Sequence, residues 1–360
     1  MSKEIYISII IPVFNSENYI KSALENLKKQ NIEDNSEIII VDDGSTDRSL
    51  EYIKNFNIKN LHVYELKSNY GPAKARNYGI QKAMGDYIYF FDADDSISNS
   101  SLSKLLEKTK NKKLDIIFSD KKRIENLRNR SHNIYAYDKN KYFDEIEINK
   151  AILNRLNDPL YLTGLLDLTG RLIKRSIIVE NNVLFRESLR YMEDEVFMWD
   201  LLPYINSAYY IKEQLYSYNI NPNVNTGVSE SLMKGFPLKN FKLVKEIIQQ
   251  CLNKRNFSTD LTVKLGDQSY IFFIISSLIS FCRSIEIGKL SKDEANKKFL
   301  DYIKEINNND DISKSLKNYT VSSNESRLIP IALKLKSNFL LKIAVKMRVS
   351  FLKRVGPPLD

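Results

Sequence analysis

Three groups of acidic residues follow or precede apolar segments, and their spacing suits cation binding or proton transfer. Asp92, Asp94 and Asp95 come directly after the apolar run YIYFF. Three carboxylates within four positions repel one another unless a cation compensates them. Mg²⁺ takes oxygen ligands, commonly one or two carboxylates together with water and substrate phosphates. The Asp-x-Asp pair therefore indicates a divalent cation site in preference to a solvated acidic turn.

A second acidic group, Asp42 and Asp43, follows the apolar run EIIIV. Removing two carboxylates from water costs free energy, so they need hydrogen-bond donors or a ligand. We expect Asp43 to accept a hydrogen bond from a nucleobase or a ribose, while Gly44 permits a tight turn. Asp47 is expected to cap the helix that follows, and Asp42 is the alternative cap.

Between these groups lies a segment of small residues, NYGPAKARN at 69–77. Small residues let a helix N-terminus approach a ligand, and its N–H groups and dipole favour a phosphate. Arg76 would pair with that phosphate or bridge Asp43 or Asp92, and both roles are compatible.

The third acidic group, Glu193-Asp194-Glu195, indicates by itself no more than a helix N-terminus, which acids stabilise. The loop PVFN at 12–15 would place a flat ring, Phe14, near a nucleobase.

Alternating strands and helices must position these residues. Apolar, β-branched runs predict buried strands, and apolar positions three and four residues apart predict helices between them. This pattern predicts an α/β fold with a mostly parallel central sheet flanked by helices, in which ligands bind beyond the carboxyl ends of the strands. The expected strands are 5–13, 37–41, 61–66, 86–91 and 114–119, and the expected helices follow Asn15 or Ser16, follow Ser45 or Thr46, and span 72–83 and 100–110.

The remainder of the chain reads differently. Residues 121–160 are mixed and charged and predict a variable flap or loop, whereas helical patterns begin near Ser229. The longest apolar run, 270–281, is shorter than the ~20 residues that span a bilayer, so a buried helix is expected. Cys251 and Cys282 lack metal-site spacing and are expected to be reduced in the core of a cytoplasmic protein.

The tail from Ser326 to Leu359 contains no acidic residue. A helical wheel groups apolar residues on one side and lysines on the other, which is typical of a helix lying in a membrane surface. A helix packed on the chain's own core, with solvated lysines, is an equal alternative. The apolar side comprises Leu340, Ala344, Met347, Phe351 and Val355, and the basic side Lys342, Lys346 and Lys353.

Taken together, five motifs resemble the family 2 glycosyltransferases over roughly residues 2–225, with 120–165 poorly matched. They are PVFN at 12–15, VDDGSTD at 41–47, NYGPAKARN at 69–77, DADD at 92–95 and MEDEVF at 192–197. The resemblance implies a GT-A fold, a nucleotide-sugar donor, Mn²⁺ or Mg²⁺, and inversion at the anomeric carbon. The implied domains are a catalytic domain at 1–225, a helical extension at 226–325 and a basic amphipathic helix at 326–360.

The resemblance also implies a role for each matching residue. Asp194 would be the general base, with Glu193 as the alternative, and Asp95 would position the donor or the acceptor. Asp94 and Asp92 would hold the metal ion, with Asp94 the direct ligand. The donor nucleotide would be bound by Pro12, Phe14, Asn15, Asp43, Asn69, Arg76, Asp92 and Ala93.

The implied activity is transfer from a nucleotide-sugar, expected to be a UDP-sugar, to a hydroxyl of a glycan or lipid-linked oligosaccharide in capsule, lipopolysaccharide or exopolysaccharide assembly. Expected partners are the donor, that acceptor and, peripherally, the anionic inner face of the cell membrane, with no nucleic acid. A sugar nucleotidyltransferase is one alternative, but PVFNSEN lacks the glycines of its signature loop. A noncatalytic nucleic-acid-binding protein would suit the net charge of +9, but no RRM, helix-turn-helix or zinc pattern supports it.

Overall fold

The chain forms two compact units. Unit 1 comprises residues 1–151 and 162–223, and unit 2 comprises 152–161 and 224–360. The expected domain boundary at 225 lies outside the described residues. The computed structural model describes residues 6–32, 34–109, 114–125, 130–134, 137–158, 164–189, 191–220, 238–286, 292–321 and 325–355.

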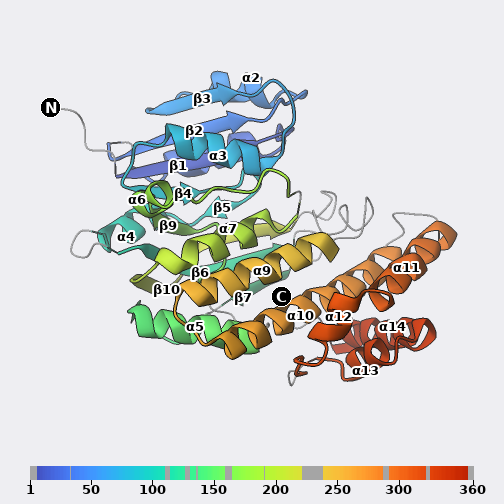
Figure 1. Cartoon of the computed structure of the whole chain (residues 1–360). Helices are drawn as coiled ribbons and strands as arrows, with labels where there is room; N and C mark the ends of the chain where they lie inside the picture. Colours follow the sequence, from blue (N-terminus) through green and yellow to red (C-terminus); the bar gives the residue numbers. More distant parts are fainter. Residues whose placement is uncertain are drawn as a thin grey trace. The chain divides into compact units, whose positions relative to one another are not determined.

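Unit 1 is built on a ten-stranded sheet with the order β3-β2-β1-β4-β9-β6-β10-β5 (Figure 1), in which β7 pairs with β6 and β8 with β10. The strands are β1 (Ile7–Val13), β2 (Ser36–Asp42), β3 (Leu61–Glu65), β4 (Tyr87–Phe90), β5 (Ser96–Ile97), β6 (Ile116–Glu125), β7 (Arg130–Ile134), β8 (Lys141–Phe143), β9 (Arg171–Lys174) and β10 (Ala208–Ile220). Its helices are α1 (Ile20–Lys28), α2 (Ser49–Lys54), α3 (Pro72–Lys82), α4 (Ser101–Glu107), α5 (Glu145–Asn157), which extends beyond unit 1, α6 (Arg175–Glu180), α7 (Glu193–Leu201) and the 3₁₀ turn η2 (Leu202–Tyr204).

The sheet is parallel where the sequence predicts parallel strands, from β3 through β2 and β1 to β4. Beyond β4 it becomes mixed, because β9 is antiparallel to both of its neighbours, β4 and β6. Each of the five expected strands is present. Four lie within two residues of their predicted bounds, and the fifth, β6, continues six residues further than predicted, to Glu125. The fold is therefore the expected α/β class, with a central sheet flanked by helices.

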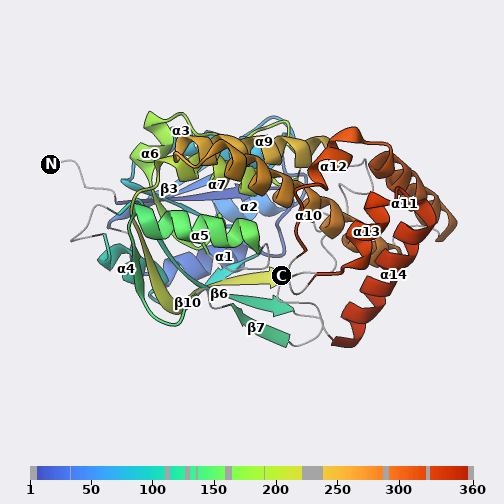
Figure 2. The same ribbon diagram turned by 60° about the horizontal axis from the view of Figure 1, so that its bottom comes forward.

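Helices cover both faces of β1 because successive side chains of a strand point to opposite faces. Ile9 and Ile11 share a buried cluster with the apolar face of α1. Ile10 points the other way, toward α3, where Gly79 lies so close that a Cβ atom would be 2.5 Å from Ile10 Cγ2. Figure 2 shows α3 above the sheet and α1 below it.

The flap predicted for residues 121–160 is wrong for the described part of that range. β6 continues through its charged half because residues up to Glu125 pair with both β7 and β10, so neighbouring strands satisfy its backbone groups. The caps predicted at Asn15 or Ser16 and at Ser45 or Thr46 are displaced, whereas Asp47 contacts the start of the helix that it was expected to cap. α1 begins at Ile20 with no side-chain cap, and α2 begins at Ser49, where Asp47 accepts hydrogen bonds from the Ser49 N–H and hydroxyl.

Unit 2 is helical in its described residues. Its helices are α9 (Leu238–Lys254), α10 (Thr259–Glu286), α11 (Lys292–Asn307), α12 (Asp310–Ser315), α13 (Leu328–Lys334) and α14 (Asn338–Val355), and they are coloured orange to red in Figure 1. Residues 229–237, where the sequence also predicts helix, lie outside the described part. Cys251 and Cys282 are buried, as expected.

One helix, α10, is long and apolar enough to cross a membrane by length and composition, over Thr259–Arg283. Within this window, 72% of the residues are buried inside the protein. The described side chains that fill the core include Tyr270, Ile274 and Leu278. This burial agrees with the core helix that the sequence predicts.

Candidate active site

Arg76 joins two of the three acidic groups. Its Nη2 donates to Asp92 Oδ1 at 3.0 Å, and its Nη1 donates to Asp194 Oδ1 at 2.9 Å and lies 3.6 Å from Glu193 Oε1. The guanidinium is buried and also faces the Phe185 ring. Burial by itself lowers the pKa of Arg76, but the three carboxylates raise it by more, so the group stays charged.

The loop before α3 places Arg76 at this point, and Asp43 holds that loop. Both carboxylate oxygens of Asp43 accept backbone hydrogen bonds, from Tyr70 at 2.9 Å and from Gly71 at 2.6 Å. Gly71 has a φ of 98° and leads into Pro72 at the first turn of the helix. Gly44 has a φ of 75°, and a Cβ atom there would lie 2.8 Å from the Ser68 backbone. Gly44 thus has a left-handed backbone conformation that favours glycine, and Asp43 is engaged by the protein itself.

Residues of β10 hold the segment that contains Asp94 and Asp95 by hydrogen bonds. Asp95 is buried and accepts hydrogen bonds from the Tyr216 hydroxyl at 2.5 Å and from Asn219 N–H at 2.9 Å. The Asn219 side chain donates to the Asp94 carbonyl oxygen at 2.8 Å. Desolvation first, and then the charge of Asp92, raise the pKa of Asp95 to about 8. Sequence reasoning missed Tyr216 and Asn219, because nothing local links them to a turn more than 120 residues earlier.

The residues of this turn fit a divalent cation. Among the described residues, no other side chain donates a hydrogen bond to the Asp94 carboxylate. Desolvation first, and then the charge of Asp92, raise the pKa of Asp94. The described part of the chain has no cluster of three or more His, Cys, Asp or Glu side chains placed to hold a metal. An Asp-x-Asp site does not need such a cluster, because water and substrate phosphates complete the coordination of Mg²⁺.

The third acidic group, Glu193-Asp194-Glu195, forms the first turn of α7. The N-terminus of this helix is therefore next to Arg76. Met192 precedes the helix with a φ of 65°, which turns the chain so that Glu193 and Asp194 face Arg76. Glu195 instead accepts a hydrogen bond from the Trp199 indole at 3.4 Å. The Asp194 side chain is 42% exposed and that of Glu193 is 15% exposed, so Asp194 is the more accessible of the two.

Asp194 has the pKa expected of a proton acceptor near neutral pH. Desolvation raises its pKa to about 7, with help from Glu193 and Asp92 and against the effect of Arg76. A carboxylate with such a pKa is deprotonated above neutral pH and still basic enough to take a proton in a reaction.

The other residues expected to bind a nucleotide lie on neighbouring loops of unit 1. Pro12 is the penultimate residue of β1. The exposed Asn15 accepts a hydrogen bond from the Thr46 N–H, which ties the loops after β1 and β2 together. Phe14 is 42% exposed, as a ring available for stacking would be. Asn69 is exposed beside the Gly71 loop, and Ala93 is buried between the acidic residues.

Lys121 is a further candidate site residue. Sequence reasoning did not select it, because it lies in the segment predicted to be a flap. Its side chain is only 16% exposed, its Nζ lies 3.4 Å from Asp167, and it lies over the Tyr216 ring. Burial lowers the pKa of Lys121, and its charge lowers that of Asp194. The available signal was that neither Gly nor Pro interrupts the chain between the apolar strand 114–119 and Lys121.

Comparisons with known proteins agree with this geometry. The model of glycosyl transferase family 2 matches residues 8–177. An uncharacterized glycosyltransferase of Haemophilus influenzae is 46% identical over 102 residues, which cover 28% of this chain and 40% of that protein. The uncharacterized glycosyltransferase EpsJ of Bacillus subtilis is 29% identical over 223 residues, which cover 62% of this chain and 63% of EpsJ.

The poly(ribitol-phosphate) beta-N-acetylglucosaminyltransferase TarS of Staphylococcus aureus is 27% identical over 214 residues, which cover 59% of this chain and 35% of TarS. The crystal structure of TarS 1–349 in complex with UDP-GlcNAc matches with a TM-score of 0.67 and 17% identity, over 98% of this chain and 93% of that one. Residues 8–177 thus match glycosyl transferase family 2, and the fold of unit 1 is GT-A.

Proposed function

We propose that this protein is an inverting glycosyltransferase that moves a sugar from a nucleotide-sugar, expected to be a UDP-sugar, to a hydroxyl group of a glycan or lipid-linked acceptor. The observation that carries the proposal is the bridge of Arg76 between Asp92 and Asp194, inside a family 2 domain. It links the acidic turn expected at the donor to the carboxylate expected at the acceptor.

The relatives support the choice of substrates. TarS transfers N-acetylglucosamine to poly(ribitol phosphate) by its name, and its structure has been solved with UDP-GlcNAc. We propose for this chain a UDP-sugar donor and an acceptor from a bacterial surface glycan, such as a capsule, a lipopolysaccharide, an exopolysaccharide or a teichoic-acid-like polymer. The site of action would be the cytoplasm, at the inner face of the cell membrane if the acceptor is lipid-linked.

The proposed chemistry uses the side chains as the structure presents them. Asp194 would accept the proton of the acceptor hydroxyl as that oxygen forms a bond to the anomeric carbon. The bond from the anomeric carbon to the nucleoside diphosphate would break on the opposite face, which inverts the configuration. Arg76 would hold Asp194 in place, and Lys121 would favour the ionised form of Asp194 by its charge.

Asp94 and Asp92 are the residues that would hold a divalent cation, Mn²⁺ or Mg²⁺. Bound there, the cation would neutralise negative charge on the leaving diphosphate. The nucleoside would lie against Pro12 and Phe14, on the loops that Asn15 and Asp43 fix. Asn69 and Ala93 would border this pocket, and Asp95 would position the donor or the acceptor.

Nucleotide binding tests the proposal. We expect UDP with Mn²⁺ to raise the melting temperature of the full chain, whereas GDP, CDP, dTDP and CMP do so weakly or not at all. Binding at 100 times Kd contributes about 2.7 kcal/mol, which a thermal scan detects. A folded sample with no shift for any of the nucleotides would contradict the proposal.

The variant Asp94→Ala distinguishes the contribution of the metal ion to UDP binding from that of the nucleotide alone. We expect it to lose the Mn²⁺-dependent part of the UDP shift, because the neighbouring Asp92 alone would hold the cation weakly. Glu107→Ala, on an exposed position of α4, is the matched control and should retain the full shift. An unchanged UDP titration for Asp94→Ala, with and without Mn²⁺, would remove Asp94 as the metal ligand.

A further inference from the structure

The last two helices expose an unusual amount of apolar surface. Nearly half of the large apolar side chains that are exposed in the described part of the protein lie within residues 328–351. Phe339 is 71% exposed, Leu335 62%, Met347 55%, Ile331 53% and Phe351 51%. Isolated exposed apolar residues need no explanation, but a contiguous group of them marks an interaction surface.

The spacing of these residues places them on one side of α14. Phe339, Ile343, Met347 and Phe351 recur at every fourth position, so they form one ridge along the helix. A second apolar face of α14 is buried in unit 2, where the helix packs against α10, α11 and α13. The buried residues are Leu341, Ala344, Val345, Val349 and Leu352.

This arrangement resolves the two alternatives that the sequence left equal. α14 packs on its own unit, and it also keeps an apolar face exposed. Leu340, Met347 and Phe351 of the predicted face are exposed, but Ala344 is buried. The side chains of Lys353 and Val355 lie outside the described part. We call the exposed face of α14, together with Leu328 and Ile331 of α13 and Leu335 directly after that helix, the apolar face.

Basic residues accompany the apolar face, and acids are absent from it. No Asp or Glu occurs from Ser326 to Leu359. Lys346 is exposed and, at about 100° per residue, lies at the edge of the ridge beside Phe339 and Ile343. Lys334 and Lys336 are exposed at the turn between the two helices. Lysines around an apolar face are typical of helices that lie in the headgroup region of a membrane.

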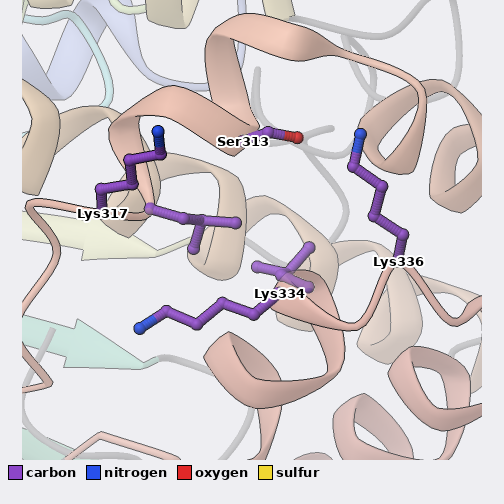
Figure 3. A pocket seen from close by; sticks show the side chains of 6 residues that line it. Ser313, Lys317, Lys334 and Lys336 are labelled. Atoms are coloured by element: carbon purple, nitrogen blue, oxygen red, sulfur yellow. The ribbon is translucent and has the colours of Figure 1, made fainter.

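A basic hollow adjoins the same turn. It has a volume of about 290 Å³ and is lined by Ser313, Leu316, Lys317, Leu333, Lys334 and Lys336. Figure 3 shows the three lysine side chains around its rim. Lys336 lies 3.9 Å from Asp310, while among the described residues neither Lys317 nor Lys334 has a carboxylate within ion-pair distance. The hollow therefore offers ammonium groups to an anionic ligand beside the apolar face.

We propose that α13 and α14 dock the protein on a bilayer that contains anionic lipids. The apolar face would enter the acyl region, and the lysines, including those of the hollow, would contact phosphate headgroups. Each Lys or Arg near such a surface contributes to binding, and burial of the apolar side chains adds to it. A symmetric contact with a second copy is disfavoured, because it would bring the same acid-free surface against itself.

Vesicle flotation of the full chain tests this proposal independently of glycosyl transfer. We expect the protein to float with vesicles of phosphatidylcholine and phosphatidylglycerol, much less with phosphatidylcholine alone, and less at high salt because salt screens the charges. The triple variant Phe339→Ser, Met347→Ser, Phe351→Ser should lower the partition coefficient at least about tenfold, because apolar contacts with the acyl region are lost. The matched control replaces Val179, Leu184 and Val263, which are exposed elsewhere, by Ser and should bind like the wild type.

A charge-reversal variant tests the contribution of the lysines to membrane binding. Lys334→Glu with Lys346→Glu should lower binding to anionic vesicles at least about tenfold. Lys29→Glu with Lys59→Glu, which changes the net charge equally at exposed sites in unit 1, should lower it far less. Absence of wild-type flotation, or equal flotation of the triple variant, would overturn the proposal. The proposal would also be overturned if light scattering showed that the wild type forms an oligomer, and if the triple serine variant dispersed this oligomer but bound vesicles as well as the wild type does.

Discussion

The acidic site of unit 1 and the apolar face of unit 2 use their charged residues in opposite ways. In unit 1, acids from two distant segments, Asp92 and the pair Glu193-Asp194, surround one buried Arg76, and hydrogen bonds from Arg76 fix Asp92 and Asp194. In unit 2, the lysines around the apolar face are exposed, and those of the hollow other than Lys336 have no ion pair among the described residues. Fixed groups with shifted pKa values suit chemistry at a single atom, because they are already oriented when the substrate binds.

A membrane surface makes a different demand. Headgroups move laterally, so side chains that contact them gain little from being fixed, and binding depends on total charge and buried apolar area. Unit 1 should therefore be sensitive to single substitutions that keep size and shape. The membrane binding proposed for unit 2 should respond only to substitutions made in groups.

The largest expected effect belongs to Asp194. Asp194→Asn keeps the shape of the side chain but cannot accept the proton, so kcat/KM for transfer should fall by about 10²–10⁴-fold while UDP binding is retained. Asp200→Asn, the same change on the same helix at a residue that pairs with Arg186, is the control and should remain much more active. A rate near that of the wild type for Asp194→Asn would assign the base to another residue, with Glu193 the first to test.

The pH profile of transfer gives a smaller effect. Because the base must be deprotonated, kcat/KM should rise with pH and level off above the pKa of Asp194, which is raised to about 7. The charge of Lys121 lowers that pKa, so Lys121→Met should move the rise to higher pH. Lys122→Met, on the opposite face of β6, should leave the profile in place. A profile that Lys121→Met does not move would show that Lys121 has no electrostatic role in the base.

The smallest expected effect is on the stability of unit 2. Phe351→Ala should change the free energy of unfolding by no more than about 0.5 kcal/mol, because an exposed side chain loses little packing. Val349→Ala, two positions away and fully buried, should cost about 1–3 kcal/mol. Urea denaturation measures both. A loss for Phe351→Ala as large as that for Val349→Ala would show that the apolar face is packed in the protein, and the contrast between the units would fail.

The sequence by itself determined the strands of the first 120 residues and the acids at their ends. Continuous apolar runs such as Ile7–Val13 have few alternatives to burial in a parallel sheet, and the carboxyl ends of such strands share one edge. It also indicated an amphipathic helix in the acid-free tail, although the structure divides this tail into two helices, α13 and α14. These features are local, because they depend on periodicity and on the types of adjacent residues.

Only the tertiary structure decided which of these groups meet. Arg76 reaches Asp194 across 118 positions of the chain, and Tyr216 reaches Asp95 across 121. Such contacts depend on strand order, in particular on β10 lying beside β6 with β5 at its edge, which no local pattern encodes. The same holds for α14. Its sequence is apolar on more than one side, so only packing against α10, α11 and α13 decides which side is buried and which stays exposed.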